Sequence, residues 1–186
     1  MTGHRADLPQ LKPGLFVSDG GMETTLIFHE GVDLPYFASF VLLDSEEGRA
    51  RLRAYYERYL AIARRHGRGL ILDTPTWRAN RDWGAKIGYD AAGLKRINEA
   101  SIMLLDELRQ AWETAQTPIV VAGVIGPRGD GYAEGRMSAT EAEDYHAPQI
   151  ASFSQTAADM VAAYTLNSVE EAIGIARAAR ALAMPC

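Results

Sequence analysis

One stretch near the N-terminus combines residue types that could bind a ligand at a tight turn. It consists of Asp19, Gly20, Gly21, Met22, Glu23 and Thr24. The apolar run Leu15–Val17 before it predicts a strand, and the residues from Glu23 onward are compatible with a helix, so the glycines lie at a strand-to-helix turn. Paired glycines lose much conformational entropy on folding, and here they indicate either positive φ angles or a backbone that a ligand approaches closely. A ligand-binding turn and a simple structural turn are both open interpretations.

Three more predicted strands also end in polar or glycine-containing loops. They are Gly69–Leu72, followed by Asp73–Asn80; Pro118–Ile125, followed by Gly126–Gly129; and Met160–Tyr164. Their apolar character and the turn residues that bound them predict buried strands. Polar residues at every strand end are typical of the active sites of barrels built from parallel strands and helices.

Helices are predicted between these strands. Asp44 or Ser45 can cap the first long helix, which has an acidic first turn, a basic last turn and Gly67 at its end. A second long helix is expected over about residues 91–115. Ser138 and Ser168 each precede a glutamate by three residues and so predict capping boxes that begin two further helices; Pro148 could interrupt the first of these.

The alternation of strands and helices predicts an α/β fold with a parallel sheet of right-handed strand-helix-strand units. Two architectures compete. A doubly wound open sheet is complete with about five strands, whereas a closed (β/α)8 barrel needs about 250 residues, so the length favours the open sheet. The sequence contains no G-x-G-x-x-G and no G-x-x-x-x-G-K-[ST] motif, however, so it does not match a nucleotide-binding design.

The composition excludes several classes of partner. A net charge of -5 and a pI near 5.4 provide no basic surface for nucleic acid. No apolar run approaches the roughly 20 residues that span a bilayer, and the N-terminal residues lack the apolar core of a signal peptide, so we expect no membrane partner and a cytoplasmic protein. The single cysteine, Cys186, excludes an internal disulfide and suits a reducing compartment.

The four strand ends resemble those of the homocysteine S-methyltransferase family, which are zinc-dependent enzymes that methylate homocysteine from S-methylmethionine, betaine or a folate. The matching segments are Asp19–Thr24, Thr74–Asn80, Gly126–Gly129 and the region from Ala158 to Ala172. The resemblance implies the family fold, a (β/α)8 TIM-type barrel, of which this chain would supply the first half, truncated at the start of the fifth strand. We therefore expect an N-terminal arm over residues 1–14 and a partial homocysteine-binding barrel domain over residues 15–186.

The resemblance also implies a set of substrate-binding residues. They are Asp19, Gly20, Gly21, Met22, Glu23, Thr74, Thr76, Trp77, Gly126 and Tyr164. Asp19 would accept a hydrogen bond from the substrate ammonium, and the backbone N–H groups of the glycine turn would hold the substrate carboxylate.

The remaining residues of this set would serve the methyl donor and the pocket wall. Thr74, Thr76 and Trp77 would lie where the donor approaches, with the Trp77 ring facing a sulfonium or an ammonium or, alternatively, packing in the core. Gly126 would line the pocket. Tyr164 stands where many members have a glutamate that binds the ammonium, and a phenol supplies no charge, which implies weaker amino-acid recognition or a different substrate.

Zinc is the cofactor that the resemblance implies, and this sequence departs from the family pattern there. Three cysteine thiolates hold the metal in the family, and a chain with Cys186 alone cannot supply them. No histidine pair has a metal-ligand spacing, and we expect His29, His66 and His146 at the surface or at helix caps.

Three hypotheses follow for the activity. The chain is a homocysteine S-methyltransferase relative that is inactive unless a second chain supplies the missing half, and its open sheet edge predicts self-association. Alternatively, it is a non-catalytic amino-acid-binding remnant. An imine-forming aldolase ranks last, because none of Lys12, Lys86 and Lys95 lies at the C-terminal end of a strand.

Overall fold

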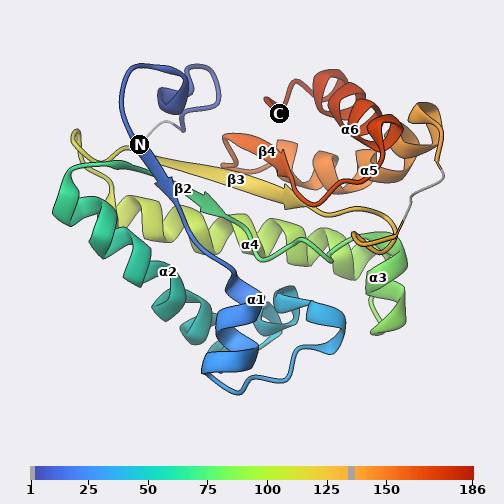
Figure 1. Cartoon of the computed structure of the whole chain (residues 1–186), viewed down its shortest axis with the longest axis horizontal. Coiled ribbons are helices and arrows are strands. Elements are labelled where there is room, and N and C mark those ends of the chain that lie inside the picture. Colours follow the sequence, from blue (N-terminus) through green and yellow to red (C-terminus); the bar gives the residue numbers. More distant parts are fainter. Residues whose placement is uncertain (1–2, 134–136) are drawn as a thin grey trace.

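Four parallel strands form the sheet of the protein, for which a computed structural model describes residues 3–133 and 137–186 (Figure 1). The strands are β1 (Phe16–Ser18), β2 (Gly69–Asp73), β3 (Ile119–Ile125) and β4 (Met160–Ala163), and they pair in the order β1-β2-β3-β4. The strands follow one another in sequence order throughout, whereas the strand order of a doubly wound sheet reverses. With right-handed crossovers, this order places all the connecting helices on one face of the sheet. The α/β class and the parallel sheet are confirmed, and the strand order is consistent with part of a barrel.

Six α-helices are found among the described residues. They are α1 (Met22–Thr24), α2 (Glu46–His66), α3 (Arg81–Lys86), α4 (Ala91–Trp112), α5 (Ala139–Ser154) and α6 (Val169–Ala181). Helices α2 and α4 pack against β2 and β3, and α5 and α6 pack against each other (Figure 1). A π-helical turn, Thr25–His29, continues α1, and 3-10 turns occur at Pro9–Leu11, Pro35–Phe37 and Ser39–Asp44.

The helix ends follow the predicted capping residues closely. The Ser45 side chain accepts the Gly48 N–H at the start of α2, and Gly67 ends this helix with a φ of 55°. Both hydrogen bonds of the Ser138 capping box are present in α5, and this helix continues through Pro148 without a break. Helix α4 ends at Trp112, a few residues before the predicted end.

The prediction for the last capping box was only half right, and the one for His146 was wrong. Ser168 accepts the Glu171 N–H, but the Glu171 carboxylate does not return to the cap. Instead it is buried, lies 2.8 Å from Nε2 of His146 and accepts the Arg128 N–H at 2.7 Å. His146 is 1% exposed, because the packing of α5 on α6 encloses it together with the glutamate.

The N-terminal arm is held at the end of the sheet where the strands begin. Asp159, which precedes β4 and is fully buried, accepts hydrogen bonds from Nη1 of Arg109 on α4 and from the backbone N–H groups of Val121 and His4. The guanidinium of Arg5 donates to backbone carbonyls between α5 and β4. These contacts tie the arm, α4, β3 and β4 into one unit at the end of the sheet opposite to α1 (Figure 1).

The segment after α6 returns to the free edge of the sheet. The Pro185 carbonyl accepts the Val161 N–H of β4 at 2.9 Å, so the chain begins to pair there as a further strand would. Among the residues that the structure describes, no helix is both long enough and apolar enough to cross a membrane.

Candidate functional site

A cavity of about 650 Å³ lies at the C-terminal ends of the four strands. Residues from each strand end and from the loops that follow contribute to its wall. Of the predicted site residues, those that line it are Asp19, Gly20, Gly21, Met22, Glu23, Thr74, Trp77 and Tyr164. The structure therefore brings together eight residues from three segments that are far apart in the sequence, because parallel neighbouring strands end at one edge of the sheet.

Two aspartates on neighbouring strand ends dominate the electrostatics of the cavity. Asp19 follows β1 and Asp73 ends β2, and both line the wall. Burial raises the pKa of Asp19 to about 7, the nearby carboxylate of Asp73 adds to this rise, and the Tyr55 hydroxyl opposes it. Burial likewise raises the pKa of Asp73 to about 6. Two carboxylates that ionise reluctantly in this way favour a cationic ligand, which would stabilise their charged forms.

Tyr164 is hydrogen-bonded to one of these two aspartates. Its hydroxyl donates to Oδ2 of Asp73 at 2.7 Å, and burial together with Asp73 raises the pKa of the phenol, which keeps it a donor. Oδ1 of Asp73 is buried and has no hydrogen-bond partner. The negative charge that Tyr164 lacks is therefore present beside it, on Asp73, with one oxygen unsatisfied.

The glycine turn presents backbone N–H groups to the same cavity. No hydrogen bond of the described residues uses the N–H of Gly20, Gly21 or Met22. Neither glycine has a positive φ, so that predicted reason for them is wrong; a Cβ on Gly20 would lie 2.8 Å from the Tyr59 hydroxyl. Tyr55 donates to the Gly20 carbonyl at 3.0 Å and holds the turn from the outside.

Glu23 faces the cavity from the first turn of α1. Its Oε1 accepts a hydrogen bond from the Ser39 hydroxyl at 2.5 Å, which fixes the carboxylate against the loop that carries Pro75. Glu23 thereby adds a third acidic side chain to the wall.

Thr74 and Thr76 connect two strand ends. Their hydroxyl oxygens lie 2.6 Å apart, Thr74 accepts the Val124 N–H, and Thr76 donates to the Val124 carbonyl. Thr76 is fully buried and does not line the cavity. Its hydroxyl is occupied by these bonds, so the structure places it behind the site rather than in contact with a ligand.

Thr76→Val is expected to lower the free energy of unfolding by about 1–2 kcal/mol, since it leaves the partners of a buried hydroxyl unsatisfied. Ligand affinity should stay within about twofold of that of the wild type, because Thr76 does not line the cavity. Urea unfolding and binding calorimetry on the same preparations measure the two effects. A large loss of affinity with unchanged stability would contradict this placement.

Trp77 has one ring face occupied by the protein itself. The Arg78 guanidinium lies 3.9 Å from the centroid of the ring, and the indole N–H donates to the Thr165 hydroxyl at 2.9 Å. Gly126 is not part of the cavity wall and instead supports this residue, because a Cβ there would lie 2.2 Å from the Trp77 carbonyl oxygen. Only the rest of the Trp77 surface is available to a ligand.

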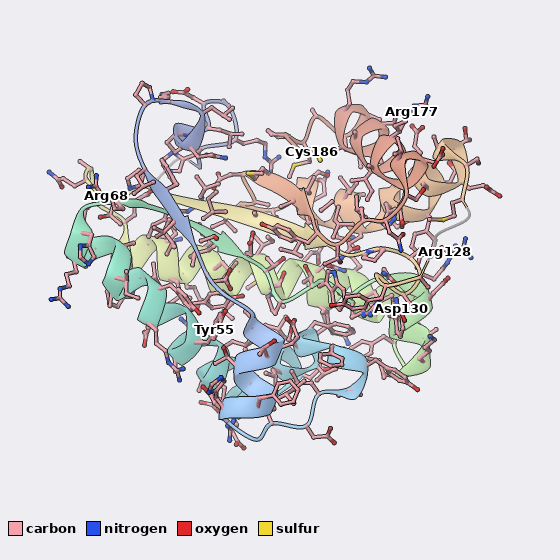
Figure 2. The ribbon with its side chains drawn as sticks, in the orientation of Figure 1. Tyr55, Arg68, Arg128, Asp130, Arg177 and Cys186 are labelled. Carbon is pink, nitrogen blue, oxygen red and sulfur yellow. The ribbon has the colours of Figure 1, made fainter. Side chains whose placement is uncertain are left out.

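Several residues of the wall were absent from the predicted set. They are Ser18, Thr24, Phe37, Asp73, Pro75, Arg78, Val124, Asp130, Tyr132 and Thr165. The sequence could have indicated Asp73, because this residue ends β2 in the same way that Asp19 directly follows β1. Asp130 lies in the loop after β3 (Figure 2). Arg78 lies in the matched segment Thr74–Asn80, although it was not among the predicted site residues.

The residues present do not fit the family's zinc site. No group of three or more histidine, cysteine, aspartate or glutamate side chains in the described part of the chain could hold a metal ion. Cys186, the single cysteine of the sequence, is exposed and lies near α6 (Figure 2).

Comparison with known proteins identifies the family. The family model for homocysteine S-methyltransferase matches residues 16–186. The fold is similar to that of the Escherichia coli homocysteine methyltransferase MmuM in its metallated crystal structure, with a TM-score of 0.73, 20% identity, and coverage of 98% of this chain and 64% of that one. The oxidized form gives a TM-score of 0.72 at 22% identity, with 95% and 61% covered.

The chain thus spans less than two thirds of the length of these solved structures. Curated proteins gave no match. A family match over almost the whole sequence, together with the shared fold, is sufficient to place it: the chain belongs to the homocysteine S-methyltransferase family.

Proposed function

We propose that the cavity binds homocysteine by its amino-acid group. Asp19 accepts hydrogen bonds from the ammonium, and the unused N–H groups of Gly20, Gly21 and Met22 hold the carboxylate. The observation that carries this proposal is the position of a carboxylate and three free backbone donors, side by side, on the wall of one cavity. Asp73, fixed by Tyr164, adds the second negative charge that the ammonium meets.

The reaction that this site would serve is methyl transfer from a sulfonium or ammonium donor to the sulfur of homocysteine. The sulfur attacks the methyl carbon, a carbon–sulfur bond forms, and the electron pair of the breaking bond leaves with the donor as it becomes neutral. Thr74 and the free part of Trp77 border the cavity where the donor would enter. We further propose that the four-stranded sheet forms part of a (β/α)8 barrel.

Zinc chemistry is not assigned to residues of this chain. The family implies a zinc site of three thiolates, and these 186 residues contain one cysteine. We therefore propose that they bind homocysteine but do not turn it over unless another polypeptide, joined through the free strand edges, contributes the thiolates. The lone cysteine equally favours a second candidate, a non-catalytic module that binds an amino acid.

Asp19→Asn is expected to weaken homocysteine binding at least about tenfold, because a neutral amide lacks the charge that strengthens a hydrogen bond to ammonium. Isothermal titration calorimetry at about pH 8 measures the change. Asp33→Asn is the matched control, since Asp33 is exposed and is not part of the cavity wall. Equal affinity of wild type and Asp19→Asn, or no binding to the wild type, would refute the proposal.

Zinc content and methylation activity separate the two candidates. The 186-residue chain should contain no stoichiometric zinc and should not form methionine from homocysteine and S-methylmethionine. Turnover with one zinc per chain would contradict this part of the proposal, and turnover only after a cysteine-containing second chain is added would favour the enzyme over the binding module.

A further inference from the structure

Arg78 is a buried cation for which the described residues offer no ion pair. The residue is 6% exposed, it follows Trp77 in the loop after β2, and it lines the cavity. Its only hydrogen bond in the described part of the chain runs from Nη1 to the Gly129 carbonyl at 3.1 Å, and Nε is buried without a partner. Buried charges are normally paired, because removal from water is costly without a counter-ion.

Two tryptophans fix the plane of this guanidinium. Its central carbon lies 3.9 Å from the ring centroid of Trp77 and 3.8 Å from that of Trp83 on α3. Stacking against two indoles restricts rotation of the guanidinium. Its N–H donors, which lie in the plane of the group, therefore have fixed directions. With Nη1 directed to Gly129, the edge formed by Nε and Nη2 remains, and this edge matches the two oxygens of a carboxylate.

The acidic residues near Arg78 do not occupy this edge. Asp130 and Glu23 are near enough to favour the charged form of the guanidinium, but neither lies within ion-pair distance in the described structure. Oδ1 of Asp130 accepts the Tyr132 N–H, and Oε1 of Glu23 accepts the Ser39 hydroxyl. One oxygen of each carboxylate is therefore held by another group.

We propose that Arg78 binds the carboxylate of the methyl donor through the Nε and Nη2 edge. Arg78 is tied to the loop after β3, whereas Asp19 and the glycine turn follow β1. The cavity thus has one carboxylate-binding place for each of two substrates. The donor class is a sulfonium or quaternary ammonium compound that also carries a carboxylate, and this assignment rests on the proposed function above.

A matched pair of ligands tests the proposal on the wild-type protein. S-methylmethionine and its methyl ester carry the same sulfonium group, but only the first has a free carboxylate. Titration calorimetry in the presence of homocysteine should give at least about tenfold weaker binding of the ester, in line with the loss of a charge-assisted bidentate contact. Equal affinity of acid and ester would overturn the proposal without the need for any variant.

Three variants complete the test. Arg78→Gln should bind S-methylmethionine at least about tenfold more weakly and should no longer distinguish it from the ester, and Arg78→Lys should recover part of the preference. Arg68→Gln is the control, because Arg68 is exposed at the other end of the sheet, before β2 (Figure 2). Circular dichroism establishes that Arg78→Gln is folded, and if it is not, the comparison of acid and ester decides alone.

The outcomes for this proposal and for the homocysteine site are distinguishable. Homocysteine affinity should stay within about twofold of the wild-type value in Arg78→Gln, because a different set of donors holds that ligand. If homocysteine binds to the wild type but the donor's carboxylate has no effect, Arg78 is only a structural cation and the homocysteine site stands. If neither ligand binds to the wild type, both proposals fail.

Discussion

Asp159→Ala is expected to lower the free energy of unfolding by about 3–5 kcal/mol, the largest single loss of stability that we foresee. The carboxylate is completely buried and accepts hydrogen bonds from Nη1 of Arg109 at 2.8 Å and from the Val121 N–H at 2.8 Å. It also accepts the His4 N–H at 2.5 Å. Its removal would leave a buried guanidinium, itself 4% exposed, with one partner fewer and two backbone donors unsatisfied.

Urea unfolding followed by circular dichroism measures this loss. Asp33→Ala serves as the control for removal of an exposed carboxylate, and it should change stability by no more than about 0.5 kcal/mol. A second consequence is local: the N-terminal arm should become more sensitive to protease, because His4 loses its anchor on Asp159. An Asp159→Ala variant as stable as the wild type would show that the arm and β4 are held by other contacts.

The double variant Asp19→Asn/Asp73→Asn is expected to be more stable than the wild type at pH 8, by on the order of 3 kcal/mol. Burial raises the pKa values of Asp19 and Asp73 to about 7 and about 6, and the Asp73 carboxylate also opposes the ionisation of Asp19. The folded state therefore holds protons that the unfolded state releases near pH 4. Ionising both groups in the folded protein costs free energy that two amides would not cost.

The sign of the pH dependence makes this prediction specific. Below about pH 4 both states are protonated, and the double variant should equal the wild type. The difference should grow as the pH rises from about 4 and become constant above about pH 8, once both groups are ionised in the folded state. Thermal unfolding at a series of pH values measures it. A stability difference that is constant with pH, or a destabilised double variant at pH 8, would contradict the description of the cavity as strained by unpaired negative charge.

Local sequence patterns predicted the elements well because their signals involve near neighbours. Ser45 and Ser138 cap helices through hydrogen bonds to residues three positions away, and Gly67 ends α2 because it can adopt a positive φ. The glycine turn after β1 could be found in the same way. These features depend on backbone geometry within one turn, which the sequence specifies directly.

The parts that could not be predicted depend on contacts between distant segments. The Glu171 carboxylate does not bond to the helix cap as predicted, because His146 on the neighbouring helix is its buried partner instead. The environment of Arg78 needs Trp83, which belongs to a short helix that the sequence did not reveal. Thr76 reads as a polar loop residue, and only its bonds to Val124 show that its hydroxyl is already used.

The residues proposed to bind the amino-acid group include one that the sequence indicated and one that it did not. Asp19 could be proposed from the turn that contains it, whereas the charge beside Tyr164 could not. A tyrosine in place of a glutamate predicted weaker recognition of the ammonium. In the structure the phenol donates to Asp73 of β2 at 2.7 Å, and under the proposed function this carboxylate supplies the charge in place of the glutamate.

The affinity of the wild-type protein for an amino acid at two pH values tests the central claim most directly. Because the pKa of Asp19 is about 7, this carboxylate is mostly neutral at pH 6 and mostly ionised at pH 8, while the ligand ammonium stays charged at both. Titration calorimetry with homocysteine, and with methionine as the ligand that lacks a thiol, should give about tenfold tighter binding at pH 8, with proton release at pH 6. Affinity that does not change between these pH values, or that changes equally in Asp19→Asn, would contradict the claim that this carboxylate receives the amino group.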